Sequence, residues 1–154
     1  MFDLIFEKFE KDLLKDYPDY SFYITDEMEE EDFAINTVVC EIGAINVVNS
    51  KNYSAQLSFY ITKPKIQDDL GNFIVQTLDI MRKIQNLDRN KTFHSKKLTM
   101  EYGELRSKEV RETFRVCRIA GEFEITNPVE NIMKSKEEYK PLTRLFINKK
   151  EVKE

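Results

Sequence analysis

One stretch in the middle of the chain, residues 66 to 87, constrains the fold more than any other. Its core-type side chains recur every three or four residues, which is the spacing that places them along one face of an α-helix. The residues of this stripe are Ile66, Leu70, Phe73, Ile74, Thr77, Leu78, Met81, Ile84 and Leu87. A stripe this wide needs a sheet to cover it, and strand-like segments precede and follow it. The stretch therefore predicts a central helix packed on a sheet.

The beginning of the chain predicts a second helix, over residues 2 to 15. Its apolar residues fall on one face and its charged residues mainly on the other. The apolar set is Phe2, Ile5, Phe6, Phe9 and Leu13. Pro18 should end the helix, because proline disfavours helical geometry in the residue before it. We expect the apolar face to dock on the core of its own subunit, and a helix that faces a partner is the alternative.

Three strand-like segments lie between the two predicted helices. Residues 20 to 25 form a short aromatic and β-branched run. Residues 33 to 50 are long for one strand, and their alternation is interrupted around Gly43, which predicts a bulge or a bend. Residues 53 to 62 alternate most clearly, and we expect them to pair with the preceding segment as an antiparallel hairpin.

Two more strands are predicted after the central helix. The first ends near Gly103, and a polar turn around residues 104 to 109 follows it. In residues 110 to 125 the phase of the apolar positions changes, which predicts a bulge or a bend near Cys117 to Gly121. Beyond Asn127 we expect a short helix, a possible edge strand and a charged, frayed end.

These elements predict a single α+β domain in the order α-β-β-β-α-β-β. The sheet should be largely antiparallel, with a mixed sheet as the alternative, and packed by the N-terminal helix and the central helix. A chain of 154 residues suits one such domain. We assign residues 1–126 to the α+β domain and residues 127–154 to a C-terminal extension packed on it.

The chain offers little recognisable chemistry for catalysis. His94 is its only histidine, which argues against a catalytic triad or a multi-histidine metal site within one subunit. Cys40 and Cys117 lie in strand-like segments and are expected to be free, buried thiols. The acidic run 26–32 lacks the alternating ligands and the glycine of a calcium loop. We therefore predict no cofactor, no metal and no enzymatic activity; an enzyme whose site forms between subunits is the alternative.

The charges are unevenly distributed along the sequence. The chain carries a net charge of −4, yet residues 1–32 hold twelve acidic and three basic side chains, so the rest is basic. This asymmetry favours oriented stacking on another charged surface. Residues 82–118 hold eleven basic and five acidic side chains. They predict either a nucleic-acid surface or, because acids are interspersed, cross-strand pairs and a protein interface.

The chain also lacks the signals of a membrane or exported protein. No apolar run approaches the length that a transmembrane helix needs. Met1, Phe2 and Asp3 do not begin the basic and apolar pattern of a signal peptide. We expect an intracellular, soluble protein with no membrane partner.

The element order resembles that of the tail terminator, or tail-completion, proteins of tailed bacteriophages, some of which are called minor capsid proteins. The resemblance covers residues 1–126 and is carried by an opening helix, a long hairpin, a central helix and a closing strand. The corresponding segments are FDLIFEKFEKDLL, FAINTVVCEIGAINVV with YSAQLSFYIT, DDLGNFIVQTLDIMRKI and RETFRVCRIAGEFEI.

The resemblance implies a structural virion protein that works by assembly. Such a protein forms a homo-oligomeric ring, typically a hexamer, which caps the tail tube and joins the tail to the head. Its partners would be the tail tube protein and head-tail connector proteins, with DNA passing nearby without being read. It would be found in the virion, and in the host cytoplasm during assembly.

Five residues are candidates for the interface, on the grounds of position and charge. They are Lys51 and Asn52 at the hairpin tip, and Arg111, Arg115 and Arg118 on the last long strand. Two other functions remain open. One is another phage head-tail connector or baseplate component, and the other is a small nucleic-acid-binding regulator.

Overall fold

The computed structural model describes residues 2–27, 29, 36–89, 93–108 and 111–126. Within them the chain forms two α-helices and five strands. These elements are α1 (Phe2–Asp16), β1 (Ser21–Thr25), β2 (Thr37–Val47), β3 (Asn52–Pro64), α2 (Leu70–Gln85), β4 (Phe93–Arg106) and β5 (Thr113–Thr126). The order α-β-β-β-α-β-β confirms the predicted fold class.

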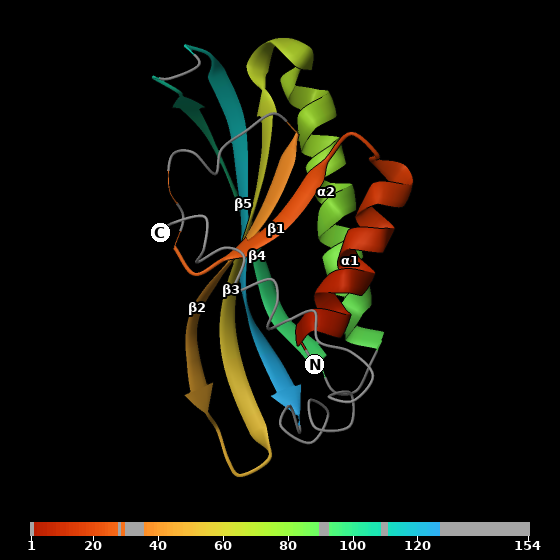
Figure 1. Cartoon of the computed structure of the whole chain (residues 1–154), viewed down its shortest axis with the longest axis vertical. Helices are drawn as coiled ribbons and strands as arrows, with labels where there is room; N and C mark the ends of the chain where they lie inside the picture. The colour runs from red at the N-terminus through yellow and green to blue at the C-terminus, as the bar shows by residue number, and fades with distance from the viewer. Residues whose placement is uncertain (1, 28, 30–35, 90–92, 109–110, 127–154) are drawn as a thin grey trace.

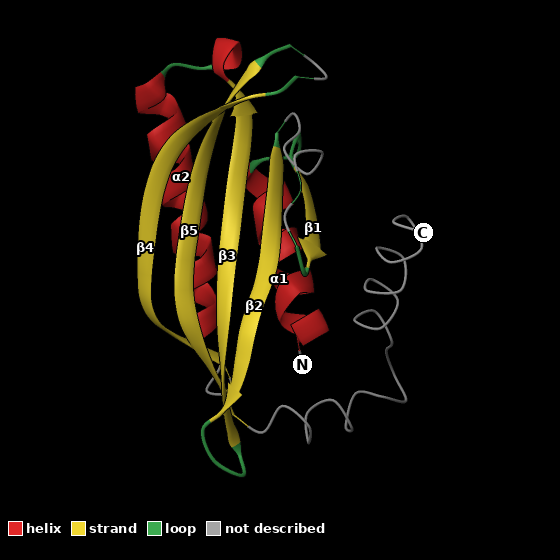
Figure 2. Cartoon of the chain, turned by 90° about the vertical axis from the view of Figure 1, so that its left-hand side faces the viewer, coloured by secondary structure: helices red, strands yellow, loops and turns green. Residues whose placement is uncertain are grey.

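The five strands form one mixed sheet in the order β1-β2-β3-β5-β4. β1 pairs with β2 in parallel, and the other three pairs are antiparallel. Because β5 lies between β3 and β4, those two strands run in the same direction, and α2 carries the chain back between them. Both helices cover the same face of the sheet, and no helix of the described residues lies on the other face (Figures 1 and 2).

The core lies between the two helices and the covered face. α1 contributes Phe6, Phe9 and Leu13, all nearly or fully buried. α2 contributes Phe73, Thr77, Ile80 and Ile84, whose spacing of three and four marks its buried stripe. The ring of Phe59 on β3 lies between the rings of Phe9 and Phe123, with centroid distances of 5.4 and 6.4 Å. The first helix therefore docks on its own subunit, as predicted.

The central helix is shorter than predicted, and its stripe is rotated. The helix begins at Leu70, where the Asp69 side chain accepts a hydrogen bond from the backbone N–H of Asn72 and caps it. Ile66 lies in a separate 3₁₀ turn and is 85% exposed, and Leu78 is 49% exposed. Ile80, absent from the predicted stripe, is fully buried. The stripe turns because α1 packs beside α2 and covers part of its surface.

Polar contacts join the two helices where they meet. The Tyr17 hydroxyl donates to a carboxylate oxygen of Asp79 at 2.7 Å, and burial together with this contact raises the pKa of Tyr17. The ammonium of Lys83, a largely buried residue, pairs with Asp16 and lies 5.9 Å from the centroid of the Tyr17 ring. The hydrogen bond and the charge of Lys83 lower the pKa of Asp16.

The sheet contains two register shifts, and only one lies where it was predicted. The shift in β2 falls between Ile42 and Ile45, which confirms the bulge expected around Gly43. β5 pairs with β3 in unbroken register from Thr126 to Phe114, so of the two predicted irregularities near Cys117 to Gly121 the bulge is wrong. The second shift lies instead in the partner strand β4, between Ser95 and Lys97.

The apparent phase change in β5 has another cause. Cys117, Ile119 and Phe123 face the helices, whereas Phe114 lies on the opposite face and is nonetheless buried. Both faces of this end of the strand are therefore covered, and apolar residues appear in both phases. The predicted helix and edge strand beyond Asn127, and most of the acidic run 26–32, lie outside the described residues.

Candidate functional site

The open face of the sheet carries a shallow groove of about 520 Å³ across β2, β3, β5 and β4. Its charged lining residues are Glu41, Lys97, Glu101, Arg118 and Glu122. Arg118 donates to the Ser58 hydroxyl at 3.1 Å. Three carboxylates against two cations give the groove no basic excess, so its charge does not suit a polyanion.

The hydroxyl of Tyr60 connects this face to β2. It donates to a carboxylate oxygen of Glu41 at 3.3 Å. Partial burial and the nearby Glu41 charge raise the pKa of Tyr60. The hydroxyl is therefore a weaker acid than an exposed tyrosine, and it acts as a donor within the sheet.

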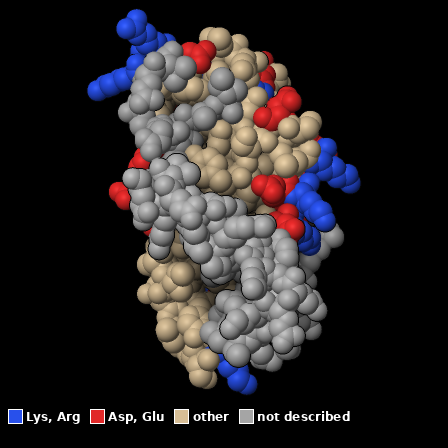
Figure 3. All heavy atoms as spheres, viewed as in Figure 1, with Lys and Arg blue, Asp and Glu red and all other residues tan. Residues whose placement is uncertain are grey.

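Two lysines of the basic stretch 82–118 form ion pairs within the subunit. Lys83 pairs with Asp16, and Lys96 pairs with Glu124 at 2.9 Å. In the view of Figure 3, acidic and basic side chains also lie next to one another at the right-hand edge, which is formed by α1 (Figure 1) and lies outside this stretch. Of the two ion pairs, that of Lys96 on β4 with Glu124 on β5 is a cross-strand pair and favours the cross-strand alternative over the nucleic-acid one.

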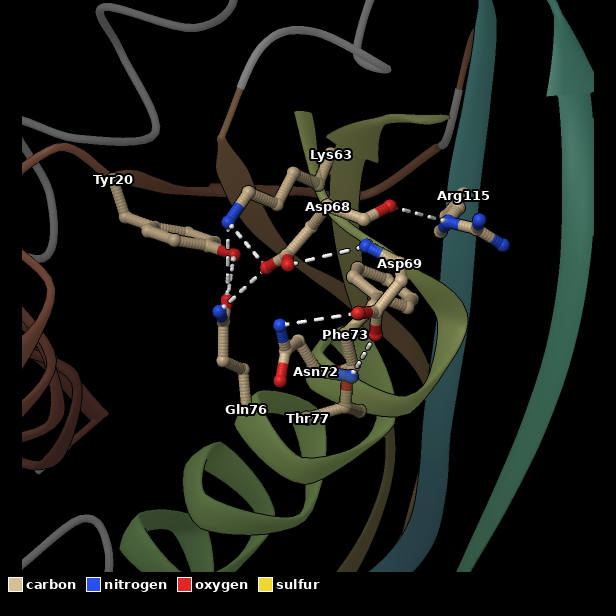
Figure 4. Close-up of polar contacts among 9 residues, drawn as sticks. All are labelled: Tyr20, Lys63, Asp68, Asp69, Asn72, Phe73, Gln76, Thr77 and Arg115. Atoms are coloured by element: carbon tan, nitrogen blue, oxygen red, sulfur yellow. Dashed lines mark hydrogen bonds and ion pairs between the residues drawn. The ribbon is translucent and has the colours of Figure 1, made fainter. Parts of the chain in front are cut away.

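A polar cluster fixes the start of α2 to the sheet (Figure 4). Lys63 on β3 donates to the Asp68 carboxylate at 3.1 Å, and the Gln76 amide donates to the same oxygen at 2.8 Å. The Tyr20 hydroxyl reaches the Gln76 carbonyl oxygen at 3.4 Å, and burial raises the pKa of Tyr20 to about 12. Arg115 donates to the Asp68 backbone carbonyl at 3.3 Å. These contacts orient α2 and do not form an open binding site.

Asp68 should make the stability of the fold sensitive to acid. Burial disfavours its charged form, but the hydrogen bonds from Lys63, Asn72 and Gln76 outweigh that effect and hold its pKa below the usual value. Its contribution is therefore present above pH ~4 and is lost as the pH falls through the lower folded-state value. We expect Asp68→Asn to flatten the dependence of the unfolding free energy on pH below 4, measured by urea unfolding at several pH values. The exposed Asp19→Asn is the control, and an equal slope in both variants would contradict the assignment.

The five predicted interface residues do not form one site. Lys51 is exposed and Asn52 is half-buried, both at the tip of the β2–β3 hairpin. Arg111 is exposed in the β4–β5 connection at the opposite end, with a positive φ of 57°. Arg115 is 9% exposed on the helix side and donates to the Tyr102 hydroxyl at 2.8 Å. Arg118 lies on the open face, in the groove.

The outer strands are the second feature that could bind a partner. Among the described strands, β4 has a strand neighbour on one side only. β1 pairs with β2 only as far as Glu41, so residues 42–47 have no described strand on their outer side. Backbone N–H and C=O groups on such edges can pair with a further strand.

Exposed apolar side chains lie close together at the end of β2, and the sequence analysis does not include them among the candidate interface residues. Ile45, Val47 and Val48 are 52%, 71% and 57% exposed. Ile45 and Val47 alternate as buried strand residues do, so the sequence predicts a core role for them. The only available signal was the polar run from Asn49 to Asn52, which marks the hairpin tip and hence distance from the core.

Neither thiol is placed for catalysis. Cys40 and Cys117 are free and buried, as predicted, and burial raises the pKa of both. In the part of the chain that the structure describes, no group of three or more His, Cys, Asp or Glu side chains is arranged to hold a metal ion.

Comparisons of the sequence with known proteins do not indicate a function for these surfaces. No helix in the described residues is long and apolar enough to cross a membrane. No protein-family model matches the chain, and no curated protein matches it.

Proposed function

We propose that the chain is a structural subunit that assembles with copies of itself into a ring, in the manner of the phage tail terminators that its element order resembles. The observation that carries the proposal is the pair of outer strands, β4 and residues 42–47 of β2, each with a described strand on one side only. Such edges are ready to receive a strand from another chain.

The strand directions suit a head-to-tail contact. β2 runs parallel to β5 and antiparallel to β3 and β4. Rotation about an axis along the strands leaves their directions unchanged. If such a rotation places β2 of one copy beside β4 of the next, the new pair is therefore antiparallel, like the adjoining pairs β2–β3 and β4–β5. A contact that joins two different surfaces generates a closed ring when the rotation closes.

The function would then be to cap the tail tube and join it to the head, with one face of the ring on the tube. This role at the tail tube is inferred from the resemblance to tail terminator proteins. A head-tail connector or baseplate component, the alternative, would use the same kind of edge contact. The mixed charge of the open-face groove and the ion pairs of Lys83 and Lys96 argue against the small nucleic-acid-binding regulator.

The test is the mass of the purified full chain, measured alone and after mixing with tail-tube rings. We expect an assembly of about six copies, visible as rings in negative stain. A tail-tube gene next to the gene for this chain would support the same conclusion. A chain that stays monomeric in both conditions and binds DNA in a salt-sensitive manner would overturn the proposal in favour of the regulator.

A further inference from the structure

We propose that the chain, before it joins a ring, forms a symmetric dimer in which the β4 strands of two copies pair in antiparallel direction and their α2 helices meet above the joined strands. The dimer goes beyond the proposed function, and its structural basis does not depend on the ring. A free strand edge can pair with any other chain, and a dimer of this kind protects the edge until assembly begins.

The edge strand β4 carries apolar side chains that its own subunit does not fully cover. Leu98, Met100 and Tyr102 lie on the side of the sheet that faces the helices, because they pair with the β5 residues on that side. None of the three is buried: Tyr102 is 40% exposed, and the other two are half-buried. The apolar side of the sheet therefore extends past the cover that α2 provides.

α2 adds exposed apolar side chains next to this strand. Asp79 and Lys83 point toward the end of α1, where they contact Tyr17 and Asp16. The opposite flank of the helix carries Leu70, Ile74, Leu78 and Met81. The two leucines are 46% and 49% exposed, and the other two residues are half-buried. α1 lies on the β1 side of the sheet and α2 on the β4 side, so this flank faces the β4 edge (Figure 2).

The strand and the helix flank lie at the same height. The rings of Phe73 on α2 and Tyr102 on β4 are 6.2 Å apart. From Phe73 the helix runs toward the start of β4, and Leu78 and Met81 lie about 8 and 12 Å further along its axis. A strand advances about 3.3 Å per residue, so these two side chains lie on either side of the level of Thr99. A two-fold axis beside Thr99 therefore brings the same part of α2 from both copies together.

The same axis pairs opposite charges across the joined strands. When antiparallel pairing is centred on Thr99, Lys97 of one copy lies opposite Glu101 of the other, and the symmetry makes two such pairs. Both side chains are exposed and line the groove on the open face. No ion pair among the described residues involves either of them. Opposite charges directly across two strands stabilise the pairing, and a shift by two residues would lose both pairs, so the charges also fix the register.

The dimer and the ring exclude each other, because both use the outer edge of β4. In the ring that edge receives β2 of a neighbour, whereas in the dimer it receives β4 of the second copy. Rings therefore grow only from subunits that have left the dimer. The dimer affinity thus limits how many subunits are free to assemble before they meet a tail tube.

Charge reversal tests the register in the full chain. Glu101→Lys sets two lysines opposite each other at both pairs, and Lys97→Glu sets two glutamates there. Each variant alone should dimerise about tenfold more weakly than the natural chain, as sedimentation without tail tubes would show. Mixed in equal amounts, the two variants should form a one-to-one dimer of natural affinity, because every lysine then meets a glutamate.

A lysine on the helix flank tests the apolar part of the contact. Leu78→Lys should weaken the dimer about tenfold or more, because it places a charge between the two α2 helices. Leu14→Lys is the matched control, since Leu14 is a 37% exposed leucine on α1, and it should leave the dimer unchanged. Both positions are exposed, so both variants should fold, as circular dichroism and thermal unfolding would show.

A single cysteine beside the axis gives a readout that does not depend on affinity. Directly opposed residues of antiparallel strands have Cβ atoms about 4.5–5.5 Å apart, so Thr99→Cys should form a disulfide between copies when diamide oxidises the two thiols. The natural Cys40 and Cys117 are fully buried and should not react. Gln56→Cys is the matched control, exposed on the same face of β3 but about 24 Å from its counterpart in the dimer, and it should not crosslink.

The outcomes separate this inference from the proposed ring. A natural chain that is a monomer or a ring in the absence of tail tubes overturns the dimer and leaves the ring proposal standing. A dimer that none of the three lysine and glutamate variants on β4 and α2 weakens uses another surface, and the inference fails. If Leu78→Lys lowers the melting temperature of a monomeric natural chain, the chain covers this flank itself, and the inference fails too. A dimer with the expected variant effects that never forms rings on tail tubes establishes the inference and overturns the proposed function.

Discussion

Replacing Phe59 with alanine is expected to lower the free energy of unfolding by about 3–5 kcal/mol. Phe59 is fully buried on β3, the central strand of the sheet. Its ring contacts Phe9 of α1 and Phe123 of β5, with centroids 5.4 and 6.4 Å away. Removing it loses the transfer free energy of a large side chain, leaves a cavity and breaks two aromatic contacts that join a helix to two strands.

Urea unfolding followed by circular dichroism measures this loss. Phe59→Leu fills most of the space and should cost distinctly less than the alanine variant. Val75→Ala removes an apolar side chain that is 66% exposed, and we expect a change of no more than about 0.5 kcal/mol. A loss below about 1 kcal/mol in Phe59→Ala would mean that the centre of the core lies elsewhere.

Most of the fold could be predicted because one side of the sheet faces helices and the other does not. Residues 53–62 alternate cleanly for this reason, with Phe59 and Ile61 in the core and Ser58 and Tyr60 on the open face. The same period of two predicted the hairpin, and the break at Gly43 predicted the bulge in β2. The parallel pairing of β1 with β2 has no local signal, since it depends on how the chain crosses between them.

The errors arose where tertiary contacts override a local pattern. The predicted stripe of α2 includes Leu78, which is exposed, and omits Ile80, which is buried, because spacing alone cannot show that α1 covers the neighbouring side of the helix. Phe114 suggested a bulge in β5, because the sequence does not distinguish an apolar residue that is buried on the open face from one that is buried in the core. The irregularity in β4 was missed, since a register shift at Ser95 to Lys97 leaves the polar character of that run unchanged.

The candidate interface residues show the same limit. Arg115 was chosen for its charge, yet its guanidinium contacts Asp68 and Tyr102, residues 47 and 13 positions away in the chain. Exposed valines at the end of β2 were not chosen, because an apolar residue in an alternating strand predicts burial. Which apolar residues stay exposed depends on where the helices end above the sheet, and the sequence of the strand does not contain that information.

Gly121→Val is expected to destabilise the fold by about 3 kcal/mol, the largest effect we foresee for adding atoms to the sheet. A Cβ atom at this position would lie 2.6 Å from Leu98 Cδ2 and 2.7 Å from the Lys97 carbonyl oxygen. The second contact is with backbone, next to the register shift in β4, so it cannot be relieved by turning a side chain. Valine normally favours strands by up to about 1 kcal/mol, so a net loss would measure the clash itself.

Gly103→Val is the matched control for this substitution. Gly103 also lies within a paired strand, but a Cβ atom there would meet nothing within 4 Å. Glycine weakens a strand because it loses more conformational entropy on folding than other residues do. Valine at this position should therefore be neutral or slightly stabilising. Thermal unfolding of both variants should therefore give shifts of opposite sign or very different size. If the two shifts are equal, β4 does not approach β5 closely at Gly121, and the register shift that brings the strands together there is misplaced.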